Sequence, residues 1–357
     1  MKKIFYDNKE FYASANSYRG FKSYFPEIFK SENFTAIYVL KGGPGSGKST
    51  ILKKLREYAN ESNLFCEAFK CSSDPFSLDG VIIENPDSRV AILDGTAPHA
   101  RDANLPGVID ELVNLGEAFD VPKLRNFRDD IIKLNFEKAT FYSRAYEYLS
   151  KSFIFHTNIK AEVSKLFDFE KCYDVCSEIL KTLPQIKPGV CSTRLISSFS
   201  KFGYRTTSDN FKNANKKYCI RGVLGTDKLM ISCLVKTLRN AHLESYVFPS
   251  ALDDDLYEGV FFEDENIIIT ESDCADSVYD SAALLRSNEI SSLEKNLKPL
   301  IDSGRYYLNL AADELAEASR CHFRLEEIYH PCVNFKIVDE IYENLLSKIK
   351  NIFQSNV

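Results

Sequence analysis

The sequence predicts an α/β protein of two similar tandem domains, each a mainly parallel sheet flanked by helices with an added helical hairpin. Three observations predict this fold class. A glycine-rich loop separates a strand-like run from a helical pattern near residue 42. Short apolar runs alternate with helical patterns through the first half. The second half then repeats the order of motifs found in the first.

Composition bounds the class of protein before any motif is considered. A chain of 357 residues is long enough for two domains, and 44% apolar with 27% charged residues is ordinary for a soluble globular protein. The net charge of −6 argues against a nucleic-acid partner. No apolar run reaches membrane-spanning length, and the start lacks the apolar segment of a signal peptide. We therefore expect a cytoplasmic protein with neither a membrane nor a nucleic-acid partner.

Ten cysteines occur without any C-x-x-C pair. In a chain of this length they predict reduced, mostly buried thiols and not a disulfide framework. Cys172 and Cys176 are four residues apart on a probable helix, which is a spacing that allows a shared metal. No companion ligand pair is evident, so the interpretation as core thiols is preferred.

The glycine-rich stretch Gly42–Thr50 fits the pattern G-x-x-x-x-G-K-[ST] of a phosphate-binding P-loop. An apolar run at 36–40 precedes it, and a helical pattern at 50–58 follows it. Glycines let successive backbone N–H groups face phosphate oxygens, and the following helix adds its positive N-terminal end. Both domains are therefore expected to be P-loop NTPase-like. The predicted nucleotide-binding residues are Gly42, Gly43, Pro44, Gly45, Ser46, Gly47, Lys48, Ser49 and Thr50.

The expected ligand is ATP with Mg²⁺. Lys48 is expected to reach the β- and γ-phosphates, and Ser49 to place its hydroxyl on Mg²⁺. No N-K-x-D string of a guanine-binding protein is present, which favours ATP over GTP. The apolar run 89–93 ends in Asp94, which fits the acid that completes the Mg²⁺ site from a neighbouring strand. A strand-ending acid that caps the next turn is the alternative.

Asp74 and Asp79 follow the second expected strand, at 64–71. Asp74 is the candidate to orient a water molecule or to take a proton from an acceptor hydroxyl, while an Asx turn before Pro75 is its structural alternative. In the loop after Asp94, Thr96, His99 and Arg101 are expected to face the phosphates. Arg101 is considered as an arginine finger, with a solvated loop arginine as the preferred interpretation.

Residues 124–183 show apolar positions at helical spacing and predict a helical hairpin, packed on the sheet or serving as a lid. Residues 184–189 contain two prolines and a glycine and are the expected linker. The domains are therefore predicted as 1–183 and 190–357.

After residue 189 the first half recurs in an eroded form. Lys48 matches Lys228, Asp94 matches Glu271, and His156 matches His322, with the order kept throughout. In this alignment Asp227 replaces Gly47 and Leu229 replaces Ser49, which removes the phosphate cradle and the Mg²⁺ ligand. The second domain is therefore expected to be inactive towards nucleotide, and is free to stabilise the first domain, bind a protein partner or cover the active site. The two histidines lie on helical faces, which favours packing or capping roles.

The chain resembles a little-characterised family of bacterial P-loop ATPases with two tandem P-loop domains. The resemblance rests on the loop Gly42–Thr50, on the string C-S-S-D-P-F-S-L-D-G at 71–80 and on L-D-G-T-A-P-H at 93–99, with a weaker likeness at 166–169. It extends over essentially the whole chain and implies ATP binding with hydrolysis, but no particular substrate. The eroded second loop departs from the family.

The leading functional prediction is Mg²⁺-dependent ATP hydrolysis in the N-terminal domain, with Lys48, Asp94 and Asp74 as the candidate catalytic groups. The runner-up is a small-molecule or nucleotide kinase that uses Asp74 as the acceptor base. A third possibility is an ATP-dependent switch or scaffold that binds a protein partner through the second domain.

Overall fold

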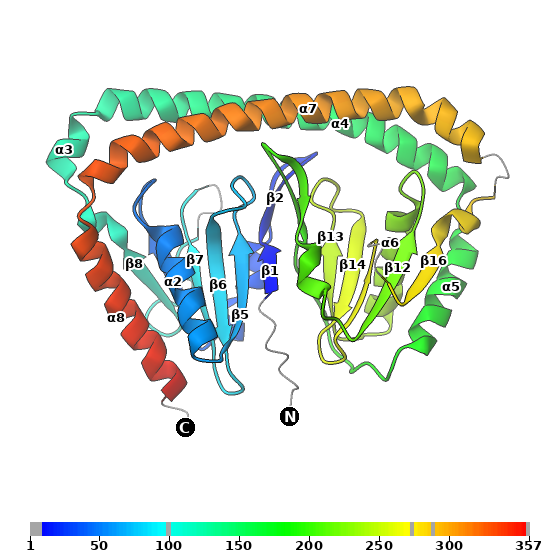
Figure 1. Cartoon of the computed structure of the whole chain (residues 1–357), viewed down its shortest axis with the longest axis horizontal. Helices are drawn as coiled ribbons and strands as arrows, with labels where there is room; N and C mark the ends of the chain where they lie inside the picture. Colours follow the sequence, from blue (N-terminus) through cyan, green and yellow to red (C-terminus); the bar gives the residue numbers. More distant parts are fainter. Residues whose placement is uncertain (1–8, 98–100, 272–274, 287–289, 355–357) are drawn as a thin grey trace. The chain divides into compact units, whose positions relative to one another are not determined.

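The structure is a computed structural model that describes residues 9–97, 101–271, 275–286 and 290–354. Over these residues the chain is an α/β protein with two six-stranded mixed sheets flanked by helices (Figure 1). Contacts divide it into two compact units. The first unit holds the described residues of 1–14, 23–145 and 312–357, and the second unit those of 15–22 and 146–311.

The sheet of the first unit has the strand order β1-β5-β6-β7-β4-β8. The central strand β4 lies between β7 and β8 and is parallel to both. The carboxyl ends of β4 and β7 therefore lie side by side, which is where ligands bind in sheets of this kind. The strands are β1 (Lys9–Tyr12), β4 (Ala36–Lys41), β5 (Phe65–Lys70), β6 (Leu78–Glu84), β7 (Arg89–Asp94) and β8 (Asp110–Asn114).

Strand β6 is the exception in an otherwise parallel sheet, because it runs antiparallel to both β5 and β7 while the other five strands share one direction. Residues 85–88 connect β6 to β7, and the Asn85 Oδ1 atom accepts hydrogen bonds from the backbone N–H groups of Asp87 and Ser88. Such a short connection joins only antiparallel strands, since a parallel pair needs a long crossover. The sheet is therefore mixed.

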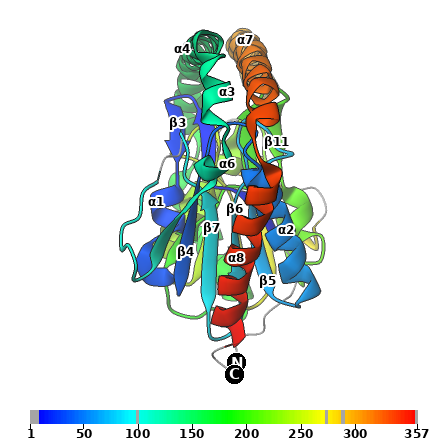
Figure 2. The ribbon, with the colours of Figure 1, turned by 90° about the vertical axis from the view of Figure 1, so that its left-hand side faces the viewer.

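Helices cover both faces of this sheet because its strands are apolar on both sides. On one face Tyr38 and Leu40 of β4 share a hydrophobic core with α2 (Lys48–Glu61) and α8 (Phe335–Gln354). Figure 2 shows α8 and α2 together on one side of the sheet and α1 on the other. Side chains alternate along a strand, so Phe69 of β5 faces the other side, where its ring packs against Phe29 at 5.2 Å between centroids.

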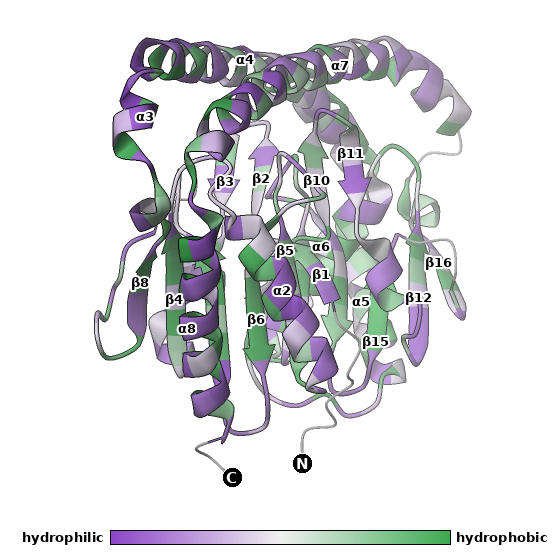
Figure 3. Ribbon diagram, turned by 60° about the vertical axis from the view of Figure 1, so that its left-hand side comes forward, coloured by the Kyte–Doolittle hydropathy of each residue, from purple (hydrophilic) through white to green (hydrophobic). Residues whose placement is uncertain are grey.

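Amphipathic character explains how α8 packs. Val338, Leu345 and Ile349 are buried at the helical spacing of one face. Figure 3 shows hydrophilic residues along the side of α8 that is turned towards the viewer, whereas β6 is largely hydrophobic. The helix therefore buries one face against the sheet and exposes the other.

The sheet of the second unit repeats this topology, with the order β9-β13-β14-β15-β12-β16. Each strand corresponds in position to one strand of the first sheet, and the parallel and antiparallel pairs also correspond. The strands are β9 (Cys191–Thr193), β12 (Lys216–Arg221), β13 (Ser245–Pro249), β14 (Tyr257–Phe262), β15 (Ile267–Thr270) and β16 (Ser277–Asp280). The internal repeat read from the sequence is thus visible as repeated topology.

Smaller elements complete the two repeats. Two antiparallel hairpins form separate two-stranded sheets. These are β2 (Ser14–Ser17) with β3 (Gly20–Ser23), and β10 (Ser197–Ser200) with β11 (Gly203–Thr206). The short helices are α1 (Phe25–Ile28), α3 (Val121–Arg125), η1 (Ser31–Asn33), η2 (Leu115–Ala118), η3 (Ser208–Phe211), η4 (Ser281–Leu284) and η5 (His330–Cys332).

The long helices divide the chain differently from the predicted domains 1–183 and 190–357. Helix α4 (Arg128–Leu166) begins in the first unit and ends in the second, and α7 (Ile290–Tyr329) does the reverse. As a result α5 (Phe169–Thr182) packs on α6 (Thr226–Asn240) in the second unit, and α8 packs in the first. Helical periodicity shows that a helix has an apolar face but not which sheet that face meets.

The expected linker 184–189 is packed against the second unit. Leu183 and Ile186 belong to its hydrophobic core, and the Gly189 N–H donates to the carbonyl of His242 at 2.8 Å. The expected helical hairpin 124–183 does not pack on the first sheet as a whole. Its helix α4 passes from the first unit into the second, and α5 packs in the second unit. Among the described residues, no helix has both the length and the apolar character required to cross a membrane.

Candidate functional site

The loop between β4 and α2 has the geometry that its glycines predict. Gly45 and Gly47 have positive φ angles of 66° and 90°, a conformation in which a Cβ is strained. Gly47 is the N-cap residue directly before α2, so the backbone turns at once from the loop into the helix. A Cβ on Gly42 would lie 2.6 Å from Ser46 Oγ, so the loop also has no room for a side chain at this position.

Lys48, the first residue of α2, lies against the loop and against β7. Its Nζ atom donates to the carbonyls of Gly42 and Gly43 at 2.8 and 2.9 Å. The same atom lies 3.8 Å from Asp94 Oδ2. The structure therefore brings Lys48 and Asp94 together. This is the arrangement that the sequence predicted for a phosphate-binding lysine and a Mg²⁺-binding acid.

The second expected Mg²⁺ ligand, Ser49, points towards β6, where its Oγ atom accepts a hydrogen bond from Leu78 N–H at 3.1 Å. Asp94 is oriented by Thr96, whose N–H and hydroxyl both donate to Oδ1 at 2.8 and 2.6 Å. This leaves Oδ2 as the Asp94 oxygen nearest to Lys48. A hydroxyl and a carboxylate oxygen are ligands that Mg²⁺ accepts, so the donor set fits the ion.

One polar atom within the loop is buried without a hydrogen bond. Ser46 has 1% of its surface exposed, and its Oγ atom has no partner among the described residues. A buried unsatisfied hydroxyl costs about 1–3 kcal/mol, which a polar ligand removes. The loop thus retains hydrogen-bonding capacity of the kind that an anion uses.

Asp79 is the acid that the sequence identified less clearly than Asp74. It is buried at the start of β6, close to Asp94, because Gly80 is paired with Leu93 across the two strands. Burial raises the pKa of Asp79 to about 8, with the charge of Asp94 acting in the same direction and Lys48 and the Cys71 thiol opposing it. Two acids side by side with one lysine favour a protonated Asp79 near neutral pH.

Asp74 occupies the turn that was considered as its structural alternative. Its Oδ1 atom accepts from Phe76 N–H at 3.3 Å, and its carbonyl accepts from Ser77 N–H at 2.9 Å. The preceding Ser73 hydroxyl is 3.0 Å from the Tyr142 hydroxyl of α4. Helix α4 therefore touches the loop that carries Asp74. The catalytic role of Asp74 stays a prediction.

Arg101 is neither an arginine finger nor a solvated residue in this structure. Its side chain is 8% exposed and lies 3.0 Å from the buried Asp110 carboxylate of β8. It also donates to the Phe29 carbonyl and to Ser31 Oγ. These contacts tie the loop after β7 to the edge strand. His99 lies outside the described residues.

The corresponding loop of the second unit corrects the sequence alignment. Gly225 has φ 87° and is the N-cap residue of α6, just as Gly47 is that of α2, so Lys48 corresponds to Thr226 and not to Lys228. Four residues, 222–225, separate β12 from α6, whereas six, 42–47, separate β4 from α2. The second loop is therefore two residues shorter.

Internal contacts fill this shorter loop. The Thr226 side chain is buried and accepts from Val223 N–H at 3.1 Å, and the Ser281 hydroxyl lies 2.9 Å from it. Lys228 lies 3.2 Å from the buried Glu258 carboxylate. Burial raises the pKa of Glu271 to about 7, with Lys228 opposing this effect and Glu258 adding to it. A phosphate would meet these acids instead of free backbone donors.

Among the described residues, one group of three histidine, cysteine or acidic side chains has its ligand atoms within 4.8 Å of one another. It consists of Asp253, Asp254 and Asp255. Their charges are already paired. Asp253 Oδ2 lies 2.9 Å from His156 Nε2 and 2.8 Å from Lys160 Nζ, and Arg19 pairs with all three acids. His156 thus anchors an ionic network, which is more specific than the packing or capping role expected for it.

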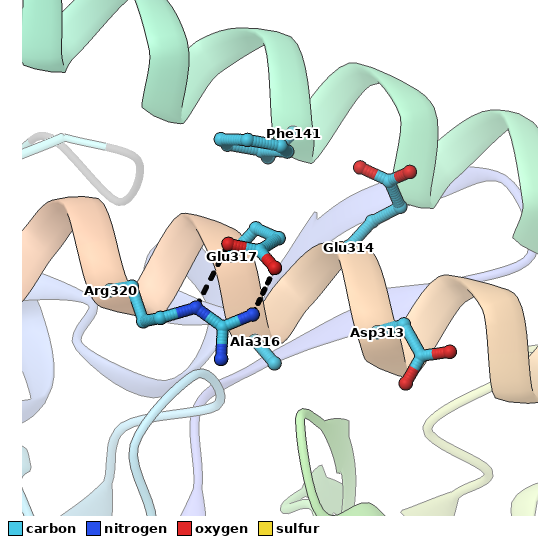
Figure 4. A pocket seen from close by; sticks show the side chains of 6 residues that line it. All are labelled: Phe141, Asp313, Glu314, Ala316, Glu317 and Arg320. Atoms are coloured by element: carbon cyan, nitrogen blue, oxygen red, sulfur yellow. Dashed lines mark hydrogen bonds and ion pairs between the residues drawn. The ribbon is translucent and has the colours of Figure 1, made fainter.

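An open hollow of about 600 Å³ lies between α4 and α7 within the first unit. Figure 4 shows the ring of Phe141 facing α7, on which Glu317 and Arg320 form an ion pair. Asp313 and Glu314 add two further acids to the lining. This acidic lining disfavours a phosphate ligand, so the hollow is not a second nucleotide site.

The cysteines agree with the expectation of reduced thiols. The described ones are all free, and most are buried, including Cys172 and Cys176 in the core of the second unit. Cys274 lies outside the described residues.

A scan against protein-family models and comparisons with curated proteins and with solved structures find no match for this chain. The resemblance to tandem P-loop ATPases therefore stays a prediction.

The raised pKa of Asp79 predicts how stability depends on pH. The proton held by folded Asp79 contributes stability that is present below about pH 4 and is lost as the pH rises to about 8. Asp79→Asn keeps the shape of the protonated acid, so the variant should match the wild type in melting temperature at about pH 3.5, where Asp79 is protonated in both states. At pH 8 it should melt roughly 5 °C higher. Asp87→Asn, in the exposed turn before β7, is the control. Equal melting temperatures at pH 8 would contradict this burial-driven shift.

Asp253 should behave in the opposite way. Burial opposes its ionisation, but hydrogen bonds from His156 and Lys160 hold the pKa of its carboxyl below the ordinary value. Its contribution is therefore present above about pH 4 and is lost below it. We expect Asp253→Asn to destabilise the protein by about 2–4 kcal/mol at pH 7, measured by urea unfolding, with a smaller difference at pH 3. Asp255→Asn, whose side chain is 63% exposed, should cost less than about 1 kcal/mol.

Proposed function

We propose that the first unit binds ATP with Mg²⁺ at the loop Gly42–Thr50 and hydrolyses it. The observation that carries this proposal is the joining of β4 to α2 by a glycine-rich loop whose lysine lies 3.8 Å from an acid at the end of the adjacent parallel strand. Backbone N–H groups, a helix N-terminus and a lysine then converge on one place, which is the chemistry that a polyphosphate requires.

Each residue has a distinct part in this proposal. Lys48 exchanges its hydrogen bonds to the Gly42 and Gly43 carbonyls for phosphate oxygens and stabilises the charge that develops there. Ser49 and Asp94 hold Mg²⁺, directly or through water. Asp79, close to Asp94, is a second acid beside the metal site, and Asp74 is the expected group to orient the attacking water.

A kinase is the second candidate, favoured by the contact between Tyr142 and Ser73. This contact places α4 against the loop that carries Asp74, as an acceptor-binding element would be placed. A kinase would release ADP only when its acceptor is present. A switch or scaffold that binds ATP without turnover would show tight binding and no ADP release.

The first test is ADP release from ATP and Mg²⁺ by the purified chain and two variants. Lys48→Ala should weaken ATP binding about 10- to 100-fold, since a charge-assisted hydrogen bond contributes about 1.5–3 kcal/mol. Asp94→Asn should lower Mg²⁺-dependent turnover by about 100-fold or more. Lys53→Ala, on the exposed face of the same helix, is the matched control and should behave as wild type. Turnover retained in Lys48→Ala would contradict the proposed site.

The second unit is proposed to bind no Mg–nucleotide, because its loop is two residues shorter and is closed by Thr226 and Ser281. Calorimetric titration with ATP and Mg²⁺ should therefore give one site per chain. Lys228→Ala should leave this stoichiometry unchanged, whereas Lys48→Ala should weaken the single site. Two equivalent sites per chain would overturn the assignment of the second unit.

A further inference from the structure

The end of α7 lies against the loop that we propose as the phosphate site, and both belong to the first unit. A Cβ on Gly43 would lie 2.9 Å from the ring of Tyr329, and one on Gly45 would lie 3.5 Å from the carbonyl oxygen of Glu326. Tyr329 is held in place by Phe119, with 5.6 Å between ring centroids in an edge-on arrangement. The helix end therefore leaves no room for a side chain at Gly43, and it is in ordinary contact with Gly45.

Glu326 places a negative charge on the loop. Its Cα and Cβ atoms would lie 3.6 and 3.7 Å from a Cβ on Gly45, and the charge of Lys48 and the Gly45 N–H both lower the pKa of its carboxyl. His322, one turn earlier on α7, lies 3.4 Å from Glu326 Oε1. The hydrogen bond from His322 is the largest cause that lowers the pKa of Glu326, while partial burial opposes it, so the side chain is an anion at neutral pH.

This arrangement puts a negative charge beside donors that a polyphosphate needs. The N–H groups of a P-loop and its lysine hold phosphate oxygens. Glu326 packs against Gly45, its carboxylate is under the influence of Lys48, and its charge repels an incoming phosphate. The Glu326 side chain is 38% exposed, so it can leave the loop without exposing a buried core.

We propose that Glu326 is an internal anion that competes with the phosphates of ATP for the loop Gly42–Thr50, so that nucleotide binding displaces the Glu326 side chain from the loop. The inference rests on the proposed function, because it takes that loop to be the phosphate site. It adds a contact that lowers nucleotide affinity and that changes between the nucleotide-free and nucleotide-bound states.

Calorimetric titration of Glu326→Gln and Glu326→Ala with Mg–ATP, and separately with tripolyphosphate, tests the competition. Gln keeps the size of the side chain and removes its charge, and tripolyphosphate tests the phosphate site without the base. Both variants should bind both ligands about 10-fold more tightly than the wild type. Glu327→Gln, the exposed neighbouring position, should bind as the wild type does. Thermal unfolding of each variant confirms that it is folded, and Glu326→Gln carries the test should Glu326→Ala fail to fold.

The outcomes separate the two proposals. Wild-type binding with no gain in either Glu326 variant would overturn the competition and leave the proposed function intact. Unchanged affinity with loss of ADP release in Glu326→Gln would overturn it in favour of a catalytic role for Glu326. Binding of neither ligand by the wild type or any variant would overturn the proposed function, and the competition with it. Binding by the variants alone would support both.

Discussion

The turn from β4 into α2 is the constraint on which the site depends. A positive φ at Gly47 allows the helix to begin immediately after the loop, which places Lys48 in its first turn and directs the helix N-terminus at the loop. The parallel pairing of β4 with β7 then brings Asp94 to the same edge of the sheet. A side chain at Gly47 would strain this turn, and a different strand order would separate the lysine from the acid.

The two units share one sheet topology but differ in the hydrogen bonds and ion pairs around the loop that follows the central strand. In the first unit, the loop retains a buried unsatisfied hydroxyl at Ser46 and a lysine bound only to carbonyls and one nearby acid. In the second unit, the shorter loop is closed by internal hydrogen bonds, and Lys228 is paired with Glu258. These differences are the basis on which we propose that an anion binds in the first unit and not in the second. In the first unit the protein's own carboxylate, Glu326, lies against the loop.

Local sequence predicted what depends on local chemistry. The strand before Gly42, the helix after Gly47 and the strand that ends at Asp94 all follow from apolar patterning and glycine placement. The apolar pattern of β6 does not give its direction, because a strand buried on both faces has the same pattern whether it runs parallel or antiparallel; the short turn at 85–88 is what requires it to run antiparallel to β7. The destinations of α5 and α8 could not be predicted either, since an apolar stripe on a helix does not specify its partner.

Three further features could be recognised only in the structure. Matching residue types aligned Lys48 with Lys228, but the backbone conformation of Gly225 shows that the second loop is shorter and that Thr226 takes the place of Lys48. Glu326 lies far along the chain from Gly45, and nothing in its surroundings marks it as a residue that contacts the loop. Asp79 gave a partial signal as an acid beside a strand, and only its burial against Asp94 separates it from Asp74.

The most direct test of the central claim is a crystal structure of the chain with a non-hydrolysable ATP analogue and Mg²⁺. The account predicts phosphates on the loop Gly42–Thr50, Lys48 turned from the loop carbonyls to the phosphates, and a metal held by Ser49 and Asp94 directly or through water. Direct Mg²⁺–oxygen distances should be about 2.0–2.1 Å. Nucleotide bound elsewhere, or no nucleotide at millimolar concentration with Lys48 still on the carbonyls, would contradict it.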